Sequence, residues 1–280
     1  MGIIQTHEWV QELVEEYEEK RSSDFYYSQL KKIGEPVSKH FPSSTPEEVL
    51  YHLQQNGLFQ PGEWRKIKPL LKSMRDIEIW KTIEVEFVRL KKQWKGPDIP
   101  IYVFPITRGY DKRQEKNKNG LAIKEAVFLF LSATHSSNEL KAILAHEYHH
   151  VCRMNVQKLN EVELRLDDLL VLEGTAEQVV KRVYGKGYMA PWTTAFKENE
   201  IKPYWNKYLV PVLDSKDHEQ NMKLMYGNKF GRPPKWMGYN AAYHLVNAFC
   251  RKKGLQKIED LFHVSAEEVI RESTFVRPRS

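Results

Sequence analysis

Residues 140–151 read LKAILAHEYHHV and contain the pattern H-E-x-x-H, from His146 to His150. On an α-helix, two histidines four positions apart lie about 40° apart around the axis and one turn apart along it. Both imidazole rings can therefore reach one metal ion. Glu147 then stands beside the first histidine, where its carboxylate can act as a base toward a water molecule at the metal. The stretch predicts a metal centre with His146 and His150 as ligands and Glu147 as the catalytic base.

The residues around this pattern predict a helix. Ser136 and Glu139 form an S-x-x-E capping box, so the helix should begin near Ser137. Apolar residues recur at helical spacing on one side, namely Leu140, Ile143, Leu144 and Val151. On a helical wheel His146 and His150 lie at the edge of this apolar stripe. We therefore expect the two histidines where a cleft meets the core.

A second segment, LEGTAE at residues 172–177, offers a third ligand. If it is helical, Glu173 and Glu177 fall on one side together with apolar residues. A buried carboxylate without a partner is very costly, so each glutamate needs a metal, another cation or strong hydrogen-bond donors. A single glutamate on such a face is usually a surface-edge or lysine-paired residue, but two of them after H-E-x-x-H favour a metal. The apolar residues on the same side are Leu166, Leu170, Val180 and Tyr184.

Two neighbours of the pattern compete as ligands. His149 follows His146 by three positions on an adjacent face. We favour His146 with His150, because that pairing places Glu147 correctly, and expect His149 to pack or to hydrogen-bond behind the ligands. Cys152 points off the metal face, so we expect it to pack rather than to bind metal.

H-E-x-x-H followed by E-G-x-A on a second helix resembles the gluzincin branch of zinc metallopeptidases. The resemblance implies Zn²⁺ as the cofactor and Glu173 as the third ligand, with Glu177 orienting a ligand histidine from behind. Together with GYNAAYHLV at residues 238–246, these motifs resemble the YjaZ-like family of zinc-dependent proteases of Bacillus-type bacteria. The resemblance covers roughly residues 97–255.

A zinc peptidase usually needs a hydrogen-bond donor for the oxyanion of its transition state. The segment at residues 238–246 offers Tyr239, Tyr243 and His244, and the two tyrosines are one helical turn apart. A phenol can donate a hydrogen bond without carrying charge. The alternative is that these tyrosines are core aromatics with their polar ends at the surface. The sequence leaves open which of the three side chains acts.

The leading hypothesis is a zinc-dependent peptidase, a hydrolase that acts on a peptide or protein substrate. By resemblance to zincins, the strand predicted at residues 126–132 could pair with an extended substrate, although its apolar side chains suit a buried strand equally well. A second hypothesis is a regulatory or interaction protein on a zincin scaffold with little or no proteolytic activity. Its motivation is the helical N-terminal region and the lack of an export signal. A nucleic-acid binder with structural zinc is a third, but no helix-turn-helix or Cys/His finger supports it, so we do not expect nucleic acid.

Composition limits the remaining classes. The chain has 280 residues, a net charge of +6 and 41% hydrophobic residues, which is typical of a soluble protein. Since no apolar run reaches membrane-spanning length, we expect no membrane partner. Cys152 and Cys250 are the two cysteines of the chain. Without a signal-peptide core they are expected to be free thiols in a reducing compartment, so we expect a cytoplasmic protein. The oligomeric state stays open.

The pattern along the chain predicts two domains. Residues 1–96 are expected to form a helical subdomain, with helices after Thr6, from Thr45 to Gly57, and over residues 64–94. Residues 97–280 are expected to form a zincin-like domain with strands at 99–106 and 126–131 before the motif helix. Further helices are expected from Asn160 to Tyr184, over residues 238–253 and over residues 255–261, and a short final turn is expected to start at Ser265. The predicted fold class is α+β and predominantly helical, with a small β-sheet above the motif helix.

Residues 107–120 are polar and hold the one local basic cluster of the sequence, namely Lys112, Arg113, Lys116 and Lys118. We expect a solvated surface loop. The alternatives are a flap that gates the cleft or a contact for an anionic partner.

Overall fold

The computed structural model describes residues 2–19, 24–107, 118–228, 230–255 and 257–273. The chain divides into two compact units, residues 1–147 and 148–280. The division falls within helix α7 (Ser137–Gln157), which carries the H-E-x-x-H pattern. The fold class is α+β and predominantly helical, as predicted. The predicted pair of domains, residues 1–96 and 97–280, stays a prediction.

The first unit contains a sheet of four strands in the order β1-β2-β4-β3. The middle strands β2 (Pro100–Pro105) and β4 (Ala126–Leu131) are parallel and buried along their whole length. Continuous apolar runs are typical of strands that are covered on both faces. β1 (Gly2–Ile3) lies parallel to β2, and β3 (Lys118–Ile123) lies antiparallel to β4.

The strand order overturns one expectation about substrate binding. β4 has β2 on one side and β3 on the other. Both of its backbone edges are therefore used within the sheet, so the expected pairing of strand 126–132 with an extended substrate is wrong. Among the described strands, β3 pairs with β4 alone. In this order β1 and β3 are the two edge strands of the sheet, and β3 is the longer of them.

The predicted loop 107–120 is wrong at its C-terminal end. Lys118, Asn119 and Gly120 begin strand β3, opposite Leu131, Phe130 and Leu129 of β4. Backbone pairing with a buried apolar strand outweighs their polar composition, because strand formation depends strongly on tertiary context. Residues 108–117, with Lys112, Arg113 and Lys116, lie outside the described residues. The expected solvated loop and its alternatives, a flap or an anionic contact, fall largely on these residues.

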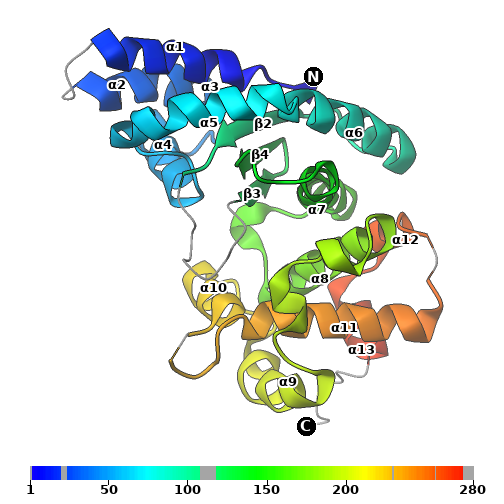
Figure 1. Ribbon diagram of the computed structural model, residues 1–280. Helices are drawn as coiled ribbons and strands as arrows, with labels where there is room; N and C mark the ends of the chain where they lie inside the picture. The colour runs from blue at the N-terminus through cyan, green and yellow to red at the C-terminus, as the bar shows by residue number, and fades with distance from the viewer. Residues whose placement is uncertain (1, 20–23, 108–117, 229, 256, 274–280) are drawn as a thin grey trace. The chain divides into compact units, whose positions relative to one another are not determined.

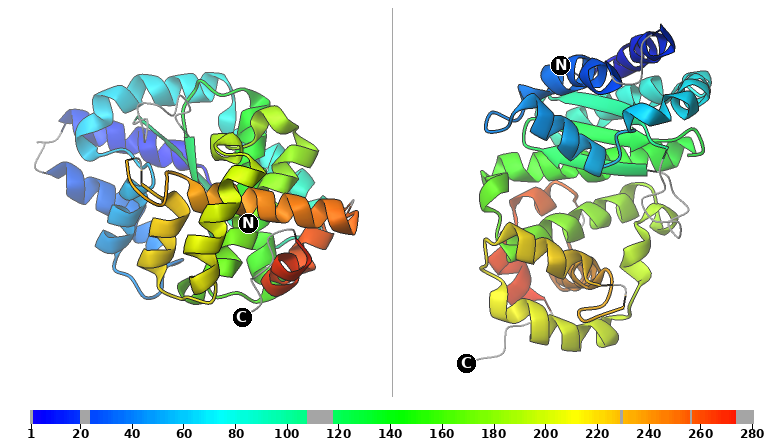
Figure 2. Two further views of the ribbon diagram at one scale, coloured as in Figure 1. Left: turned by 90° about the horizontal axis from the view of Figure 1, so that it is seen from below. Right: turned by 90° about the vertical axis from the view of Figure 1, so that its left-hand side faces the viewer.

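A layer of helices covers one face of the sheet. Helices α1 (Thr6–Glu19) and α5 (Trp64–Asp76) contact β2, and α6 (Ile79–Trp94) contacts β1. Figure 1 and the right view of Figure 2 show the start of α7 on the opposite face of the sheet. The capping box at Thr45 begins α4 (Pro46–Gln55), as predicted. Two short helices, α2 (Phe25–Gln29) and α3 (Glu35–Ser38), contact α1 and α4, respectively.

The single helix predicted over residues 64–94 is wrong. The chain breaks after Asp76, and Glu78 adopts a left-handed conformation with φ of 51° before α6 begins. Both segments keep an apolar stripe, so the break is invisible in the helical period. Before the break α5 contacts α1 and β2, whereas after it α6 contacts β1.

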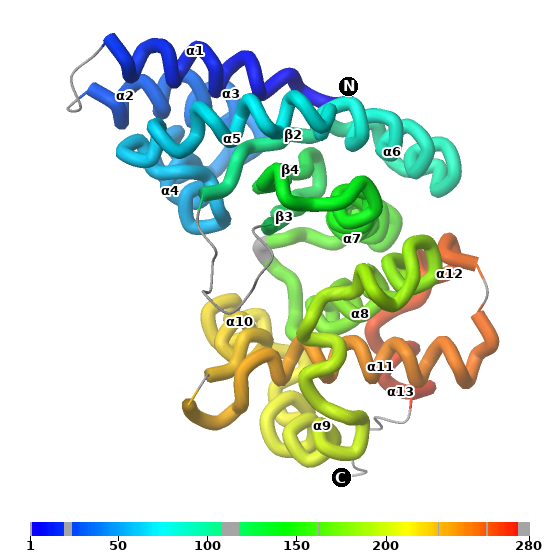
Figure 3. Tube along the Cα trace, in the orientation of Figure 1, coloured from blue at the N-terminus to red at the C-terminus, as the bar shows by residue number. Residues whose placement is uncertain are grey.

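The described residues of the second unit form mainly helices. α8 (Leu166–Val183) and α11 (Met237–Lys253) pack against each other, as the tube in Figure 3 shows. The predicted cap at Ser265 begins α13, where Ser265 Oγ accepts a hydrogen bond from the N–H of Glu268 at 3.1 Å. No helix in the described ranges has the length and apolar character that crossing a membrane requires. The other helices are α9 (Glu198–Tyr204), α10 (His218–Tyr226), α12 (Asp260–His263) and α13 (Ala266–Glu272).

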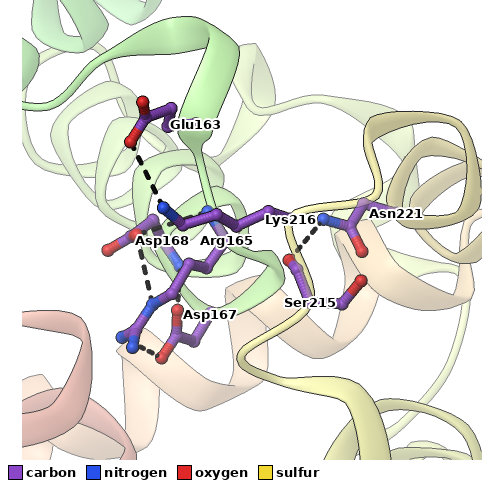
Figure 4. Close-up of polar contacts among 7 residues, drawn as sticks. All are labelled: Glu163, Arg165, Asp167, Asp168, Ser215, Lys216 and Asn221. Atoms are coloured by element: carbon purple, nitrogen blue, oxygen red, sulfur yellow. Dashed lines mark hydrogen bonds and ion pairs between the residues drawn. The ribbon is translucent and has the colours of Figure 1, made fainter.

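Helix α8 begins later than the cap predicted at Asn160. Residues 161–163 form a separate 3₁₀ turn, and Arg165 is the N-cap of α8. Figure 4 shows the polar contacts around this start, where Arg165 pairs with Asp167 at 2.6 Å. The N–H of Leu166 donates to the carbonyl of Ser215 at 3.0 Å, and the Asn221 side chain donates to the same carbonyl at 2.8 Å. These contacts fix the start of the helix that carries Glu173.

Candidate metal centre

Helix α7 begins as the capping box predicts. The N–H of Glu139 donates to Ser136 Oγ at 3.3 Å, and the N–H of Ser136 donates to the Glu139 carboxylate at 3.0 Å. These bonds satisfy backbone N–H groups that a helix start leaves without partners. The helix then continues to Gln157 and carries both motif histidines on one side.

The ligand atoms of His146, His150 and Glu173 all lie within 4.8 Å of one another. Within this cluster, His150 Nε2 lies 3.7 Å from Glu173 Oε1. Two ligands that each lie about 2.1 Å from a tetrahedral zinc ion are about 3.4 Å apart. Two imidazoles and one carboxylate are also a common ligand set of catalytic zinc, with a fourth position left for water. The three side chains therefore fit a single zinc ion.

The two glutamates of LEGTAE differ in what they contact. Glu173 retains 20% side-chain exposure and lies beside His150. Glu177 is 2% exposed, and its Oε2 accepts a hydrogen bond from the N–H of Ala190 at 2.9 Å. A buried carboxylate needs a strong hydrogen-bond donor, because burying its charge is costly. The structure thus places Glu173 in the cluster, while the proposed orientation of a ligand histidine by Glu177 stays a prediction.

Gly174 explains why this motif contains a glycine in mid-helix. A Cβ atom there would lie 2.3 Å from the carbonyl oxygen of Ala242 and 2.5 Å from Val246 Cγ2. Only glycine lets α8 approach α11 this closely. The neighbouring Glu173 is therefore carried on a helix whose position is determined by close backbone packing.

Glu147 is 8% exposed and lies against strand β3. A Cβ atom at Gly120 would lie 2.2 Å from Glu147 Oε1 and 2.4 Å from its Cδ. Sequence reasoning missed Gly120, because that segment was expected to be a loop. A glycine in a short segment before an apolar strand can mark a close approach of another group to the backbone, and this signal could have identified it.

The competing ligands lie outside the cluster of described residues. His149 is fully buried, and its ring packs on Phe262 with 5.0 Å between the ring centroids. Cys152 is 2% exposed, and burial raises the pKa of its thiol to about 12. Because metals bind the thiolate form, this environment does not favour Cys152 as a ligand. Packing was expected for Cys152, and packing or hydrogen bonding behind the ligands was expected for His149.

The candidate oxyanion donors lie on α11 and are all partly buried. Tyr239 packs between the rings of Trp192 and Tyr226, at 5.2 Å from each. Burial and the nearby Glu177 carboxylate raise the pKa of Tyr243. His244 Nε2 donates a hydrogen bond to the carbonyl of Phe196 at 2.9 Å, since a carbonyl only accepts. One N–H of His244 is thus already used within the protein.

Asn240 is a further buried polar residue that sequence reasoning did not single out. It is 0% exposed, and its Nδ2 donates to the carbonyl of Trp192 at 2.9 Å and to those of Thr193 and Phe196 at 3.3 Å. The bond from Ala190 to Glu177 holds the start of the same segment. Helices α8 and α11 therefore both bind residues 190–196. An asparagine between apolar residues in GYNAAYHLV was the available signal.

Comparisons with known proteins place the chain in a family. The family model described as "Predicted Zn-dependent protease (DUF2268)" matches residues 79–271. The chain is 29% identical to "Uncharacterized protein YjaZ" of Bacillus subtilis over 242 residues, which is 80% of this chain and 88% of that protein. It is 27% identical to "Uncharacterized protein YjfC" of the same organism over 139 residues, 47% of this chain and 46% of that protein. No solved structure matches the chain. The match confirms the expected YjaZ-like resemblance: the chain belongs to the predicted Zn-dependent protease family.

Proposed function

We propose that the protein is a zinc-dependent peptidase of the gluzincin type. The observation that carries the proposal is the cluster of His146, His150 and Glu173, with Glu147 next to the first ligand on the same helix. The family description supports the choice of metal. When bound there, zinc would lower the pKa of a water molecule and polarise the carbonyl of the substrate.

Glu147 supplies the proton transfers of this reaction. Its carboxylate accepts a proton as water attacks the carbonyl carbon and later gives that proton to the leaving amine. The side chain is largely shielded from solvent and is confined between α7 and β3. This confinement limits the positions that the carboxylate can take. A base that accepts a proton from one particular water molecule has to be held in this way.

Tyr243 is the donor that we propose for the developing oxyanion. Burial and Glu177 raise the pKa of its phenol, so it keeps its proton at neutral and mildly alkaline pH. Tyr239 is the alternative on the same helix. His244 is a weaker candidate, because its Nε2–H already binds the carbonyl of Phe196. The donor acts by stabilising charge that is present only in the transition state.

The strand order supports a place for an extended peptide or protein substrate. β3 is partly exposed along all six residues, and Gly120 on it approaches the base. A peptide paired along the outer edge of β3 would be held by backbone hydrogen bonds, which do not depend on its side chains. We propose this edge in place of the strand at residues 126–132. Two buried free cysteines fit a cytoplasmic setting, and we propose no membrane or nucleic-acid partner.

The test compares Glu147→Gln with the wild-type full chain. Zinc content is measured by elemental analysis, and hydrolysis is followed on casein and a panel of peptides. We expect about one zinc per chain in both proteins and a rate about 10²–10⁴-fold lower in Glu147→Gln. Glu125→Gln, an exposed glutamate in the turn between β3 and β4, is the matched control and should change neither quantity.

Hydrolysis that survives Glu147→Gln would refute the role of the base. If the wild-type chain binds zinc but leaves every substrate intact, the alternative of a regulatory or interaction protein on a zincin scaffold is favoured. Removal of zinc with a chelator should abolish hydrolysis, and added zinc should restore it.

A further inference from the structure

We propose that Gly120 of strand β3 is a positioning residue that determines where the Glu147 carboxylate lies. The inference rests on the proposed role of Glu147 as the base and names a residue that acts through it. Gly120 has no side chain, and Glu147 fills the space that a side chain would take.

The close approach involves most of the Glu147 side chain. A Cβ atom at Gly120 would lie 2.2 Å from Oε1, 2.4 Å from Cδ and 2.5 Å from Cγ of Glu147, whereas an ordinary van der Waals contact is 3.4–4 Å. Even a methyl group at position 120 therefore excludes the observed position of the carboxylate. The glutamate side chain lies close along the strand backbone at this residue.

Backbone conformation does not require glycine at this position. The φ of Gly120 lies outside the positive region, and the residue is part of a regular extended strand. Alanine could therefore adopt the same backbone angles without strain. The requirement for glycine comes from space alone, and the occupant of that space is the proposed catalytic base.

The strand is held so that it cannot easily move away. Gly120 pairs with Leu129 of β4, and β4 is buried along its whole length. The adjacent Asn119 donates from Nδ2 to the carbonyl of Asn56 at 2.8 Å, just after the end of α4. A methyl group at position 120 would thus displace the flexible end of Glu147 rather than the strand.

The first test is structural and needs no activity. Crystal structures and zinc contents of Gly120→Ala and Gly62→Ala are compared with those of the wild-type protein. Gly62 is the control, because a Cβ atom there would meet nothing within 4 Å. In Gly120→Ala we expect the Glu147 carboxylate to move by at least about 1 Å, the difference between 2.2 Å and an ordinary contact. Zinc content and the positions of His146 and Glu173 should stay unchanged.

A Glu147 side chain that keeps its place while β3 shifts would overturn the proposal, and so would loss of zinc from Gly120→Ala.

The kinetic test then measures the functional effect. A misplacement of about 1 Å at a reacting group can cost about 100-fold, so we expect kcat of Gly120→Ala to fall by about that factor. KM should stay within about twofold, since substrate binding does not use the Glu147 carboxylate. Gly62→Ala should match the wild-type protein in both constants.

A double variant shows whether Gly120 acts through Glu147. Glu147→Gln keeps the shape of the side chain but removes the base, so Gly120→Ala should lower its kcat no further. Multiplication of the two effects would show that Gly120 acts by another route and would overturn the proposal. If the wild-type chain hydrolyses no substrate, the peptidase proposal fails, while the displacement of Glu147 still decides the structural relationship.

Discussion

The Nε2 atom of His150 lies 3.7 Å from Oε1 of Glu173, and this pair joins the metal-binding sides of α7 and α8. The separation is close to the distance of about 3.4 Å between two ligands of one tetrahedral zinc ion. Glu177, one turn further along α8, instead accepts a hydrogen bond from a backbone N–H. Helix α8 therefore carries one carboxylate placed to bind metal and another placed to hold a neighbouring segment.

Substitution of the two glutamates separates these roles. Glu173→Ala removes a proposed ligand, so its zinc affinity should fall by more than about 100-fold, whereas Glu177→Ala should lose about 100-fold or less. Competition with a chromophoric chelator measures both affinities. Glu173→Gln and Glu177→Gln serve as matched variants of unchanged size. A larger loss in the Glu177 variants would identify that residue as the ligand.

Gly174→Ala should destabilise the protein although alanine is the better helix former. Helix propensity favours alanine by about 1 kcal/mol. The new Cβ atom would lie 2.3 Å from the carbonyl oxygen of Ala242, which is backbone and cannot rotate away. Overpacking of this kind costs about 1–3 kcal/mol, so we expect the free energy of unfolding to fall. Urea titration measures it.

Gly187→Ala is the control for this substitution, since a Cβ atom at Gly187 meets nothing within 4 Å. Its free energy of unfolding should stay within about 0.5 kcal/mol of the wild-type value. Equal or greater stability of Gly174→Ala would contradict the close packing of α8 on α11.

Arg153 is a buried cation whose loss should also destabilise the second unit. It is 1% exposed and donates to the carbonyls of Leu261 and Val264, both at 2.7 Å. Burial lowers its pKa to about 10, so the guanidinium is charged at neutral pH. Arg153→Met leaves two carbonyl groups without these donors, and we expect a loss of about 2–4 kcal/mol in unfolding free energy.

Arg251→Met is the matched control, because the Arg251 side chain is 62% exposed and pairs with Glu198 at the surface. A surface pair contributes at most about 1 kcal/mol. Chemical denaturation followed by circular dichroism compares the two variants. Equal losses in both would show that the buried hydrogen bonds of Arg153 contribute no more than a surface pair.

Tyr243→Phe should lower kcat by about 10²–10³-fold, the usual cost of removing one oxyanion donor. Tyr239→Phe should lower it less, and His244→Gln should act mainly on stability by weakening the bond to Phe196. Because the pKa of Tyr243 is raised, its phenol remains protonated above its ordinary pKa of about 10. The rate should therefore not fall on the alkaline side through ionisation of this residue below about that pH. A pH–rate profile of the wild-type protein, together with kcat of each variant, tests these statements.

Local features of the fold were predictable from the sequence. The capping boxes at Ser136 and Thr45 begin helices as expected, because a cap depends on residues three positions apart. The apolar runs in β2 and β4 form buried strands, as expected, because a continuous apolar run is also a pattern of neighbouring residues. The break at Glu78 was missed, since helical period alone cannot show that two consecutive helices contact different elements.

Spacing along single helices was enough to predict the motif helix, the two histidines on one side of it and a pair of carboxylates on the inward side of α8. Three further relationships emerged from the folded chain: Glu173 lies beside His150, β3 occupies the sheet edge, and Gly120 lies against Glu147. Each of them joins segments that are distant in sequence. They depend on strand order and close backbone packing, which no local pattern encodes.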